Sequence, residues 1–109
     1  MSDQPVTVRD DAEANRFEAV DGSGVVAGFA AYRRYADRIV FIHTVVDDAF
    51  EGRGVGATLV RAALDAARGE GLRVLPQCSF VRSYIERHPE YADLTSGPAR
   101  EPQDSQDSD

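Results

Sequence analysis

Hydrophobic residues in the first half of the chain follow the patterns that are typical of β-strands. Arg16–Val20 alternates between polar and apolar positions, and residues 25–35 and Arg38–Val46 are rich in β-branched and aromatic side chains. The segments between them, residues 21–24 and 36–37, predict tight turns, because the glycines of the first segment permit the positive φ of a hairpin. The three strands are therefore expected to form an antiparallel meander.

Two details of these strands bear on the architecture. Gly28 lies inside the second strand and indicates a β-bulge there. Residues 39–46 are apolar on both alternating faces, a pattern that favours a central strand covered on both sides.

After residue 50 the spacing of apolar residues changes from two to three and four. Val55–Gly69 repeats apolar residues at this helical spacing and ends in glycine, which predicts an amphipathic helix. Residues 72–75 predict a short strand, and a helix between two strands forms a crossover that places the later strand parallel to an earlier one. Residues 80–87 predict a second helix. Its expected inward positions are Phe80, Tyr84 and Ile85, and Tyr91 and Leu94 are expected to cap the core.

Length and composition favour one folded domain between polar ends. The chain has 109 residues, of which 42% are hydrophobic, enough for one modest core. Residues 1–13 and 95–109 each carry four acidic residues against one arginine, so most of the formal net charge of -7 lies at the ends. We expect a flexible N-terminus over residues 1–13, a folded domain over residues 14–94 and a disordered acidic tail over residues 95–109.

The composition disfavours several classes of function. The folded segment lacks the clustered basic face that nucleic-acid binding needs, and no apolar run approaches the ~20 residues of a membrane span. The chain has no lysine, which excludes a lysine Schiff base and a Walker lysine. Cys78 is the single cysteine, so no internal disulfide forms, which fits a cytoplasmic location. His88 and Glu90 offer too few ligands for zinc, and no metal is expected.

Gly54 and Gly56 stand where the first helix is predicted to begin. Glycine permits unusual backbone angles and lets a ligand approach without meeting a Cβ atom. The N–H groups in the first turn of a helix have no internal partner and, together with the helix dipole, attract anions. Arg53 in the same turn would add a charge-assisted contact to a phosphate. The short pattern predicts either a phosphate-binding turn or an ordinary loop whose glycines allow tight packing.

Three motifs surround this turn, namely HTVV at residues 43–46, FEGRGVGATLV at residues 50–60, and PQCSFV at residues 76–81 followed by YIERHPEY at residues 84–91. With the order of predicted elements, they resemble GNAT-type N-acetyltransferases, in which a turn of the pattern R/Q-x-x-G-x-G/A binds the pyrophosphate of acetyl-CoA. More specifically, the chain resembles the minimal GNAT subfamily of N-acetyltransferase domain-containing proteins, over about residues 15–94. The resemblance implies an α/β fold with a GNAT-like mixed sheet.

The resemblance also implies a set of site residues. The residues implied to bind acetyl-CoA are Thr44, Val45, Val46, Arg53, Gly54, Val55, Gly56, Ala57 and Thr58. Two positions depart from the family pattern. Glu51 stands where the superfamily usually has Arg or Gln, and because a carboxylate repels phosphate, we expect it to point away from the site. Val45 stands where the subfamily often has Glu, a residue that could serve relatives as a general base.

Cys78, His43 and Tyr84 are the candidate catalytic residues. His43 near the end of the third strand and Cys78 just past the end of the fourth are expected at one edge of the sheet, where an imidazole would activate the thiol for an acetyl-cysteine intermediate. In the alternative of direct transfer, His43 acts as the base and backbone N–H groups near residues 45–46 polarise the carbonyl. By its position in the helix after the fourth strand, Tyr84 resembles the tyrosine that protonates the departing CoA thiolate in many GNAT enzymes. Each of these side chains also has a purely structural interpretation. Cys78 would be a buried thiol, His43 a hydrogen-bonded histidine of the strand, and Tyr84 a tyrosine of the core.

The sequence leaves three functions open. The leading one is an acetyl-CoA-dependent N-acetyltransferase whose acceptor is an unidentified small-molecule or protein amine. The second is a non-catalytic module that senses CoA or acetyl-CoA. The third is a structural interaction domain, which predicts that no CoA binds.

Overall fold

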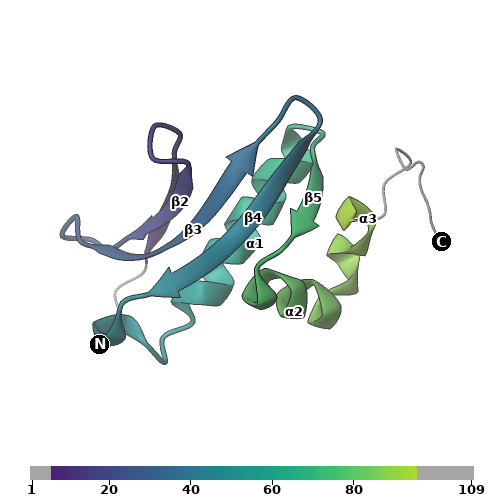
Figure 1. The fold of residues 1–109 in the computed structure, drawn as a ribbon. Helices are drawn as coiled ribbons and strands as arrows, with labels where there is room; N and C mark the ends of the chain where they lie inside the picture. The colour runs from purple at the N-terminus through teal and green to yellow at the C-terminus, as the bar shows by residue number, and fades with distance from the viewer. Residues whose placement is uncertain (1–5, 96–109) are drawn as a thin grey trace.

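The computed structural model describes residues 6–95, which form one mixed five-stranded sheet with its helices (Figure 1). The strands lie side by side in chain order; the first four pair antiparallel, and the last two pair parallel. The strands are β1 (Thr7–Asp11), β2 (Arg16–Val20), β3 (Val26–Arg34), β4 (Arg38–Val46) and β5 (Arg73–Pro76). The helices are the 3-10 helix η1 (Asp48–Phe50), α1 (Val55–Gly69), α2 (Ser79–Arg87), the 3-10 helix η2 (Pro89–Tyr91) and α3 (Ala92–Thr95).

The predicted α/β fold, an antiparallel meander followed by a crossover helix and a parallel strand, is confirmed. β2, β4 and α1 have the bounds that the hydrophobic pattern predicts, and β3 is one residue shorter at each end. The register between β2 and β3 shifts next to Gly28, where a bulge was expected. A Cβ atom at Gly28 would lie 2.6 Å from the carbonyl oxygen of Val45, so the close approach of β3 and β4 also requires glycine here.

The N-terminal strand β1 was not predicted. Residues 1–13 were expected to be flexible, and this is wrong for Thr7–Asp11, which pairs with β2 along its whole length. Val6 and Val8 pack against the core, so pairing with β2 gives this polar segment an order that its composition does not indicate. The acidic tail expected from residue 95 onward lies outside the described residues, except for Thr95 at the end of α3.

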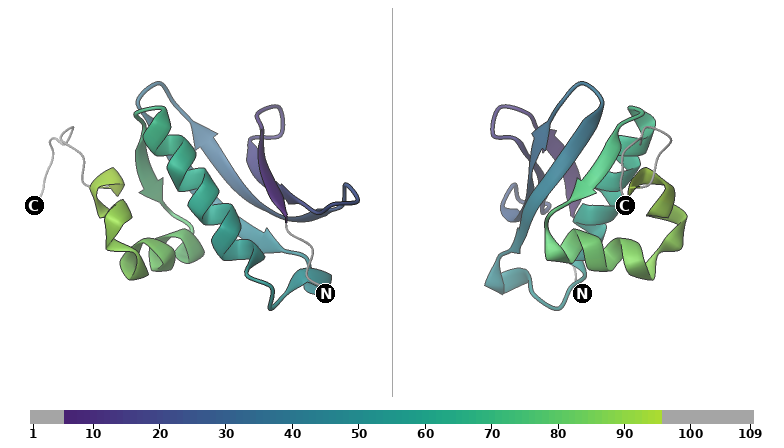
Figure 2. Two further views of the ribbon diagram at one scale, coloured as in Figure 1. Left: turned by 180° about the vertical axis from the view of Figure 1, so that it is seen from behind. Right: turned by 45° about the vertical axis from the view of Figure 1, so that its right-hand side comes forward.

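Helix α1 covers one face of the sheet, which we call the inner face. Seen from behind in Figure 2, α1 runs across the strands, while α2 and α3 lie beside β5. The core between the inner face and the helices includes Phe17, Ile39, Phe41, Leu59, Leu64 and Val81. Within the described residues, no helix combines the length and the apolar character that crossing a membrane requires.

Among the described residues, no helix lies over β2, β3 and β4 on the opposite face, which we call the outer face (Figure 1). The doubly covered central strand expected from the sequence is therefore wrong for β4, whose Val45 is 43% exposed. Polar contacts organise the outer face instead. Glu18 is buried, and its carboxylate accepts hydrogen bonds from Arg16 at 2.7 Å and from Arg9 at 2.9 Å. These two bonds hold the pKa of Glu18 below its ordinary value.

Helix α2 turns Phe80 away from the core. The buried residues of α2 are Val81, Tyr84 and Ile85. The inward positions predicted at residues 84 and 85 are thus confirmed, while Phe80 is 38% exposed and the prediction for it is wrong. Tyr91 is buried as expected, and its hydroxyl donates a 2.7 Å hydrogen bond to Asp65 of α1. Burial and then this hydrogen bond raise the pKa of Tyr91 to about 12.

Candidate functional site

A bulge divides strand β4 into two parts. The register between β3 and β4 shifts between Phe41 and His43, which leaves Ile42 without a partner on β3. An extra residue of this kind exchanges the faces on which the following side chains lie. Thr44 and Val46 therefore share the inner face with Phe41, and His43 lies on the outer face.

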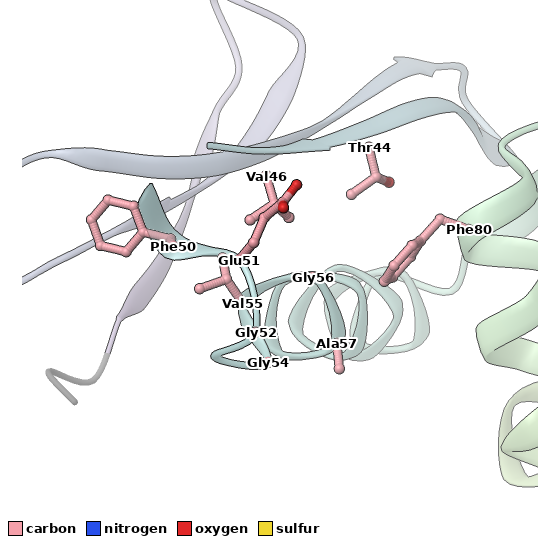
Figure 3. A pocket seen from close by; sticks show the side chains of 10 residues that line it. All are labelled: Thr44, Val46, Phe50, Glu51, Gly52, Gly54, Val55, Gly56, Ala57 and Phe80. Carbon is pink, nitrogen blue, oxygen red and sulfur yellow. The ribbon is translucent and has the colours of Figure 1, made fainter. Parts of the chain in front are cut away.

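Beyond the bulge, β4 separates from β5 and a pocket opens on the inner face. β5 pairs with β4 only as far as Phe41 and Pro76, after which the chain turns into α2. The pocket lies between the second part of β4 and the N-terminus of α1 and has a volume of about 550 Å³ (Figure 3). Its lining residues are Thr44, Val46, Phe50, Glu51, Gly52, Gly54, Val55, Gly56, Ala57 and Phe80.

The glycine turn opens α1 as predicted. Gly54 is the N-cap of α1 and has a φ of 74°, a left-handed conformation that glycine adopts without strain. Thr58 N–H donates a 3.0 Å hydrogen bond to the Gly54 carbonyl, so the N–H groups of residues 55–57 precede the helical ladder. Gly54 has no side chain to cap them. The turn therefore presents backbone donors and the positive end of the helix dipole to the pocket.

Gly56 is a glycine for a different reason from Gly54. Its backbone has no positive φ, but a Cβ atom at this position would lie 2.7 Å from the Cζ atom of Phe80. A Cβ atom at Gly54 would meet nothing within 4 Å. The first glycine is thus required by backbone conformation, and the second by the close approach of an aromatic ring.

The charges in the turn differ from the expectation. Glu51 was expected to point away from the site, and this is wrong, because it lines the pocket and its side chain points into it in Figure 3. Of the lining residues, Glu51 is the only charged one. Arg53 is not among them, and its guanidinium lies 5.4 Å from the centre of the Phe50 ring. An anion at the turn would meet backbone donors together with one carboxylate.

The structure brings together most of the residues that were predicted to bind the cofactor. Those that line the pocket are Thr44, Val46, Gly54, Val55, Gly56 and Ala57. Val45 lies on the outer face, and Arg53 and Thr58 are not among the lining residues. Residues 50–52 belong to the same sequence motif and could have been included from it. Phe80 could not, because its apolar character and helical spacing indicate a core position.

The structure separates His43 from Cys78. Cys78 is buried beside the pocket, with its Sγ atom 3.4 Å from the Oγ1 atom of Thr44. His43 lies on the outer face, where its ring packs edge-on against Phe29 with the centroids 5.8 Å apart. The expected contact between the imidazole of His43 and the thiol of Cys78 does not form. Simple alternation would place His43 on the inner face of the sheet, but the bulge at Ile42 places Thr44 there instead.

Tyr84 lies in the core rather than at the pocket. It is buried, its ring stacks on that of His88 with the centroids 4.0 Å apart, and the Tyr91 ring lies 6.1 Å away. It is not among the residues that line the pocket. These contacts fit its structural interpretation.

The comparisons with known proteins agree with this geometry. A model of the GCN5-related N-acetyl-transferase family matches residues 16–94. The chain belongs to this family. The matched region begins at β2 and contains β4, the glycine turn and α1, which together form the pocket, so the resemblance indicated by the motifs is confirmed.

Individual members of the family match over most of the chain. The protein named NATD1 from Mus musculus is 30% identical over 86 residues, which cover 78% of each chain. NATD1 from Gallus gallus matches with the same identity and extent. Streptothricin acetyltransferase from Streptomyces lavendulae is 38% identical over 64 residues, which cover 57% of this chain and 34% of that enzyme.

Solved structures show the same family fold. A GCN5-like protein from Staphylococcus aureus, determined in solution by NMR, has a TM-score of 0.59 and 29% identity, and the match covers 86% of this chain and 89% of that one. Ard1 from Thermoplasma volcanium has a TM-score of 0.54 at 22% identity over 72% of this chain and 57% of its own, which shows the fold alone.

Proposed function

We propose that this GNAT-family chain binds acetyl-CoA in the pocket between β4 and α1 and transfers the acetyl group to an amine. The observation that carries the proposal is the pocket itself, which joins the glycine turn to the part of β4 that has no partner in β5. Its volume of about 550 Å³ suits part of a CoA molecule, and its walls are mostly apolar with a few polar groups, as in other cofactor sites.

The two ends of the pocket suit the two ends of the cofactor. The N–H groups of residues 55–57 and the helix dipole bind the pyrophosphate. The thioester arm runs along Val46 and Thr44, where β4 has no partner in β5 beyond Phe41 and its backbone offers hydrogen bonds to the amides of the arm. The acetyl group then lies near Thr44 and Cys78.

Direct transfer is the route that the contacts favour. The nitrogen of an unprotonated acceptor amine attacks the thioester carbonyl carbon, a C–N bond forms, the C–S bond breaks, and the proton lost by the amine neutralises the departing thiolate. An acetyl-cysteine route needs a base beside Cys78, and the Thr44 hydroxyl in contact with its sulfur is not basic at neutral pH. His43 and Tyr84 have no part in this scheme, since one lies on the outer face and the other in the core.

A second candidate is a module that binds CoA without catalysing a reaction. It is favoured because the candidate catalytic side chains of His43 and Tyr84 lie away from the pocket. The pocket holds neither His43 nor Tyr84, and Val45, which stands where the subfamily often has glutamate, lies on the outer face. The two candidates share the CoA site and differ in whether an acetyl group leaves it.

Two measurements separate the candidates. Calorimetric titration with CoA and acetyl-CoA is expected to show binding, and the absence of heat at millimolar ligand would eliminate both and leave a structural domain. Release of the CoA thiol from acetyl-CoA is then followed with a panel of amines. Amine-dependent release supports the transferase, while tight binding without release supports the sensor. The Cys78→Ala variant should retain release, and loss of release with a trapped acetyl-protein in the wild type would instead support the covalent route.

A further inference from the structure

The outer face of the sheet has a charge opposite in sign to that of the whole chain. Because side chains alternate between the two faces of a strand, the register of the five strands shows which charged residues share this face. The acidic strand residues on it are Asp11 and Glu18, and the basic ones are Arg9, Arg16, Arg33, Arg38 and Arg73. Five positive and two negative charges give these strand residues a net charge of +3, whereas the chain as a whole carries -7.

Strand pairing alone brings these arginines together. They are spread along the sequence from residue 9 to residue 73, so the sequence shows no basic cluster. Among the residues that the structure describes, no helix covers β2, β3 and β4 on this face, and the arginine side chains reach solvent (Figure 1). Arg9 has a side chain that is 61% exposed, and Arg33 is exposed beside Val40 of the neighbouring strand. Glu18 is buried between Arg9 and Arg16, so its negative charge is neutralised within the face.

A small apolar patch lies between these arginines. Phe29 pairs with Val45 across β3 and β4, and the exposed His43 lies edge-on against the Phe29 ring. Val45 is one of the most exposed large hydrophobic residues of the described chain. Arg16 borders the patch on β2, and Arg33 borders it further along β3. An apolar centre within a charged surround, with arginine and aromatic residues, is the usual composition of a protein–protein interface.

The arginines cover the aromatic rings of this face. The guanidinium of Arg16 lies 4.5 Å from the centre of the Phe29 ring. At the β3–β4 turn, the guanidinium of Arg38 lies 4.1 Å from the centre of the Tyr35 ring and also pairs with Asp37. Single-stranded nucleic acids are bound by stacking their bases on open aromatic rings. Carboxylates need only the N–H groups of a guanidinium, which remain available when its plane lies over a ring. The covered rings therefore favour a protein partner over a nucleic acid.

We propose that the outer face binds an acidic segment of a partner protein. An apolar side chain of the segment packs on Phe29 and Val45, and its carboxylates pair with the surrounding arginines. The rest of the chain is acidic and repels such a segment, so the charge distribution directs the partner to this face. The CoA pocket lies on the inner face, and the proposal does not depend on it.

The test measures the binding of labelled probes by fluorescence anisotropy. The probes are a peptide of alternating glutamate and leucine, the same peptide with lysine in place of glutamate, and a single-stranded RNA with the formal charge of the acidic peptide. The wild type is expected to bind the acidic peptide at least about tenfold more tightly than either of the others. The affinity should fall as salt is raised, because salt screens the charges.

Two variants locate the binding on the outer face. Arg33→Glu reverses an exposed charge and should weaken the acidic peptide at least about fivefold, since a repulsion replaces an attraction. Val45→Asp places a carboxylate in the apolar patch and should also weaken it. The matched control is Arg61→Glu, an exposed position of α1 on the other side of the sheet, which changes the net charge by the same amount. It should keep the wild-type affinity within about twofold.

The outcomes decide between the possible occupants of the face. Equal weakening in Arg33→Glu and Arg61→Glu would mean that only the net charge matters, and no binding of the acidic peptide would also overturn the proposal. RNA bound as tightly as the acidic peptide and weakened by Arg33→Glu would assign the face to nucleic acid. A wild-type dimer in sedimentation that is lost in Val45→Asp would assign it to a second copy of the chain. Circular dichroism and thermal melting check the fold, and if Arg33→Glu is unfolded, Arg33→Gln takes its place in the comparison.

Discussion

The two parts of strand β4 are both rich in β-favouring residues, but their surroundings differ. Before the bulge, residues 39–41 pair with β3 on one side and with β5 on the other, and Ile39 and Phe41 are fully buried. After the bulge, residues 43–46 pair only with β3, and their inner side chains line a pocket. The first part therefore contributes to the core and the second to the site.

The difference comes from neighbours rather than from apolar character. β5 ends at Pro76, so the second part of β4 loses the neighbour that would fill its edge. Backbone groups without a strand partner beside a pocket are available to a ligand.

Removal of a buried side chain from the first part of β4 should have the largest effect on the stability of the fold. Phe41→Ala removes a fully buried ring and is expected to lower the free energy of unfolding by about 3–5 kcal/mol. Urea denaturation followed by circular dichroism measures the change. The control from the other part of the strand is Val45→Ala, which should cost well under half as much because Val45 is 43% exposed. Equal losses in the two variants would contradict the division of the strand.

Distortion of the glycine turn should remove ligand binding. Gly54→Val forces a β-branched residue to a φ of 74°, which costs about 1–2 kcal/mol and reorients the N–H groups of the turn. Calorimetry is expected to show at least a tenfold weaker affinity for CoA. The control is Gly24→Val in the β2–β3 turn, where φ is 89° and space is also open. It should lose similar stability and keep CoA affinity, and a wild-type affinity in Gly54→Val would remove the turn from the site.

Neutralisation of the pocket carboxylate should strengthen the binding of CoA. Glu51→Gln removes the charged group among the lining residues, and we expect about a fivefold tighter affinity, or about 1 kcal/mol. The gain should shrink as salt is raised, because salt screens the repulsion between carboxylate and phosphate. Asp48→Asn in η1 changes an exposed carboxylate that does not line the pocket, and it is the control. An affinity unchanged in Glu51→Gln would mean that the carboxylate lies away from the bound phosphates.

Replacement of His43 should have the smallest effect. Because the bulge places His43 on the outer face, His43→Ala is expected to keep both CoA affinity and amine-dependent CoA release within about twofold of the wild type. Initial rates measured across neutral pH test this. A loss of release with affinity retained would give His43 a role in catalysis from the outer face.

Local patterns predicted much of this molecule. The alternation in Arg16–Val20 and the helical spacing in Val55–Gly69 fixed those elements to the residue, since each pattern expresses which side chains one element can bury. Gly54 could be assigned to a helix-opening turn because its need for a positive φ is a property of one residue and its neighbours. Strand β1 could not be predicted in this way, because it is ordered by its pairing with β2 and its own sequence is polar.

Most residues of the candidate site could be predicted from the sequence, but the positions of their side chains relative to one another could not. Thr44 and His43 are adjacent in a β-favouring run, and only the register with β3 reveals the bulge that puts Thr44 in the pocket and His43 outside it. Phe80 has the spacing of a core residue, and only the packing of α2 against the sheet and α1 leaves its ring over Gly56. Glu51 is local to the turn, yet its direction depends on the space that β4 and α1 enclose.

The amino-acid sequence by itself determined the strands of the meander, the crossover helix, the glycine turn and membership of the family, because these depend on periodicity and on residues that lie next to one another along the chain. The tertiary structure decided which face each site residue takes, which pairs meet and where the pocket opens. Those properties arise from the register between strands and from the end of β5 beside β4, and a one-residue shift in register moves a side chain to the other face of the sheet.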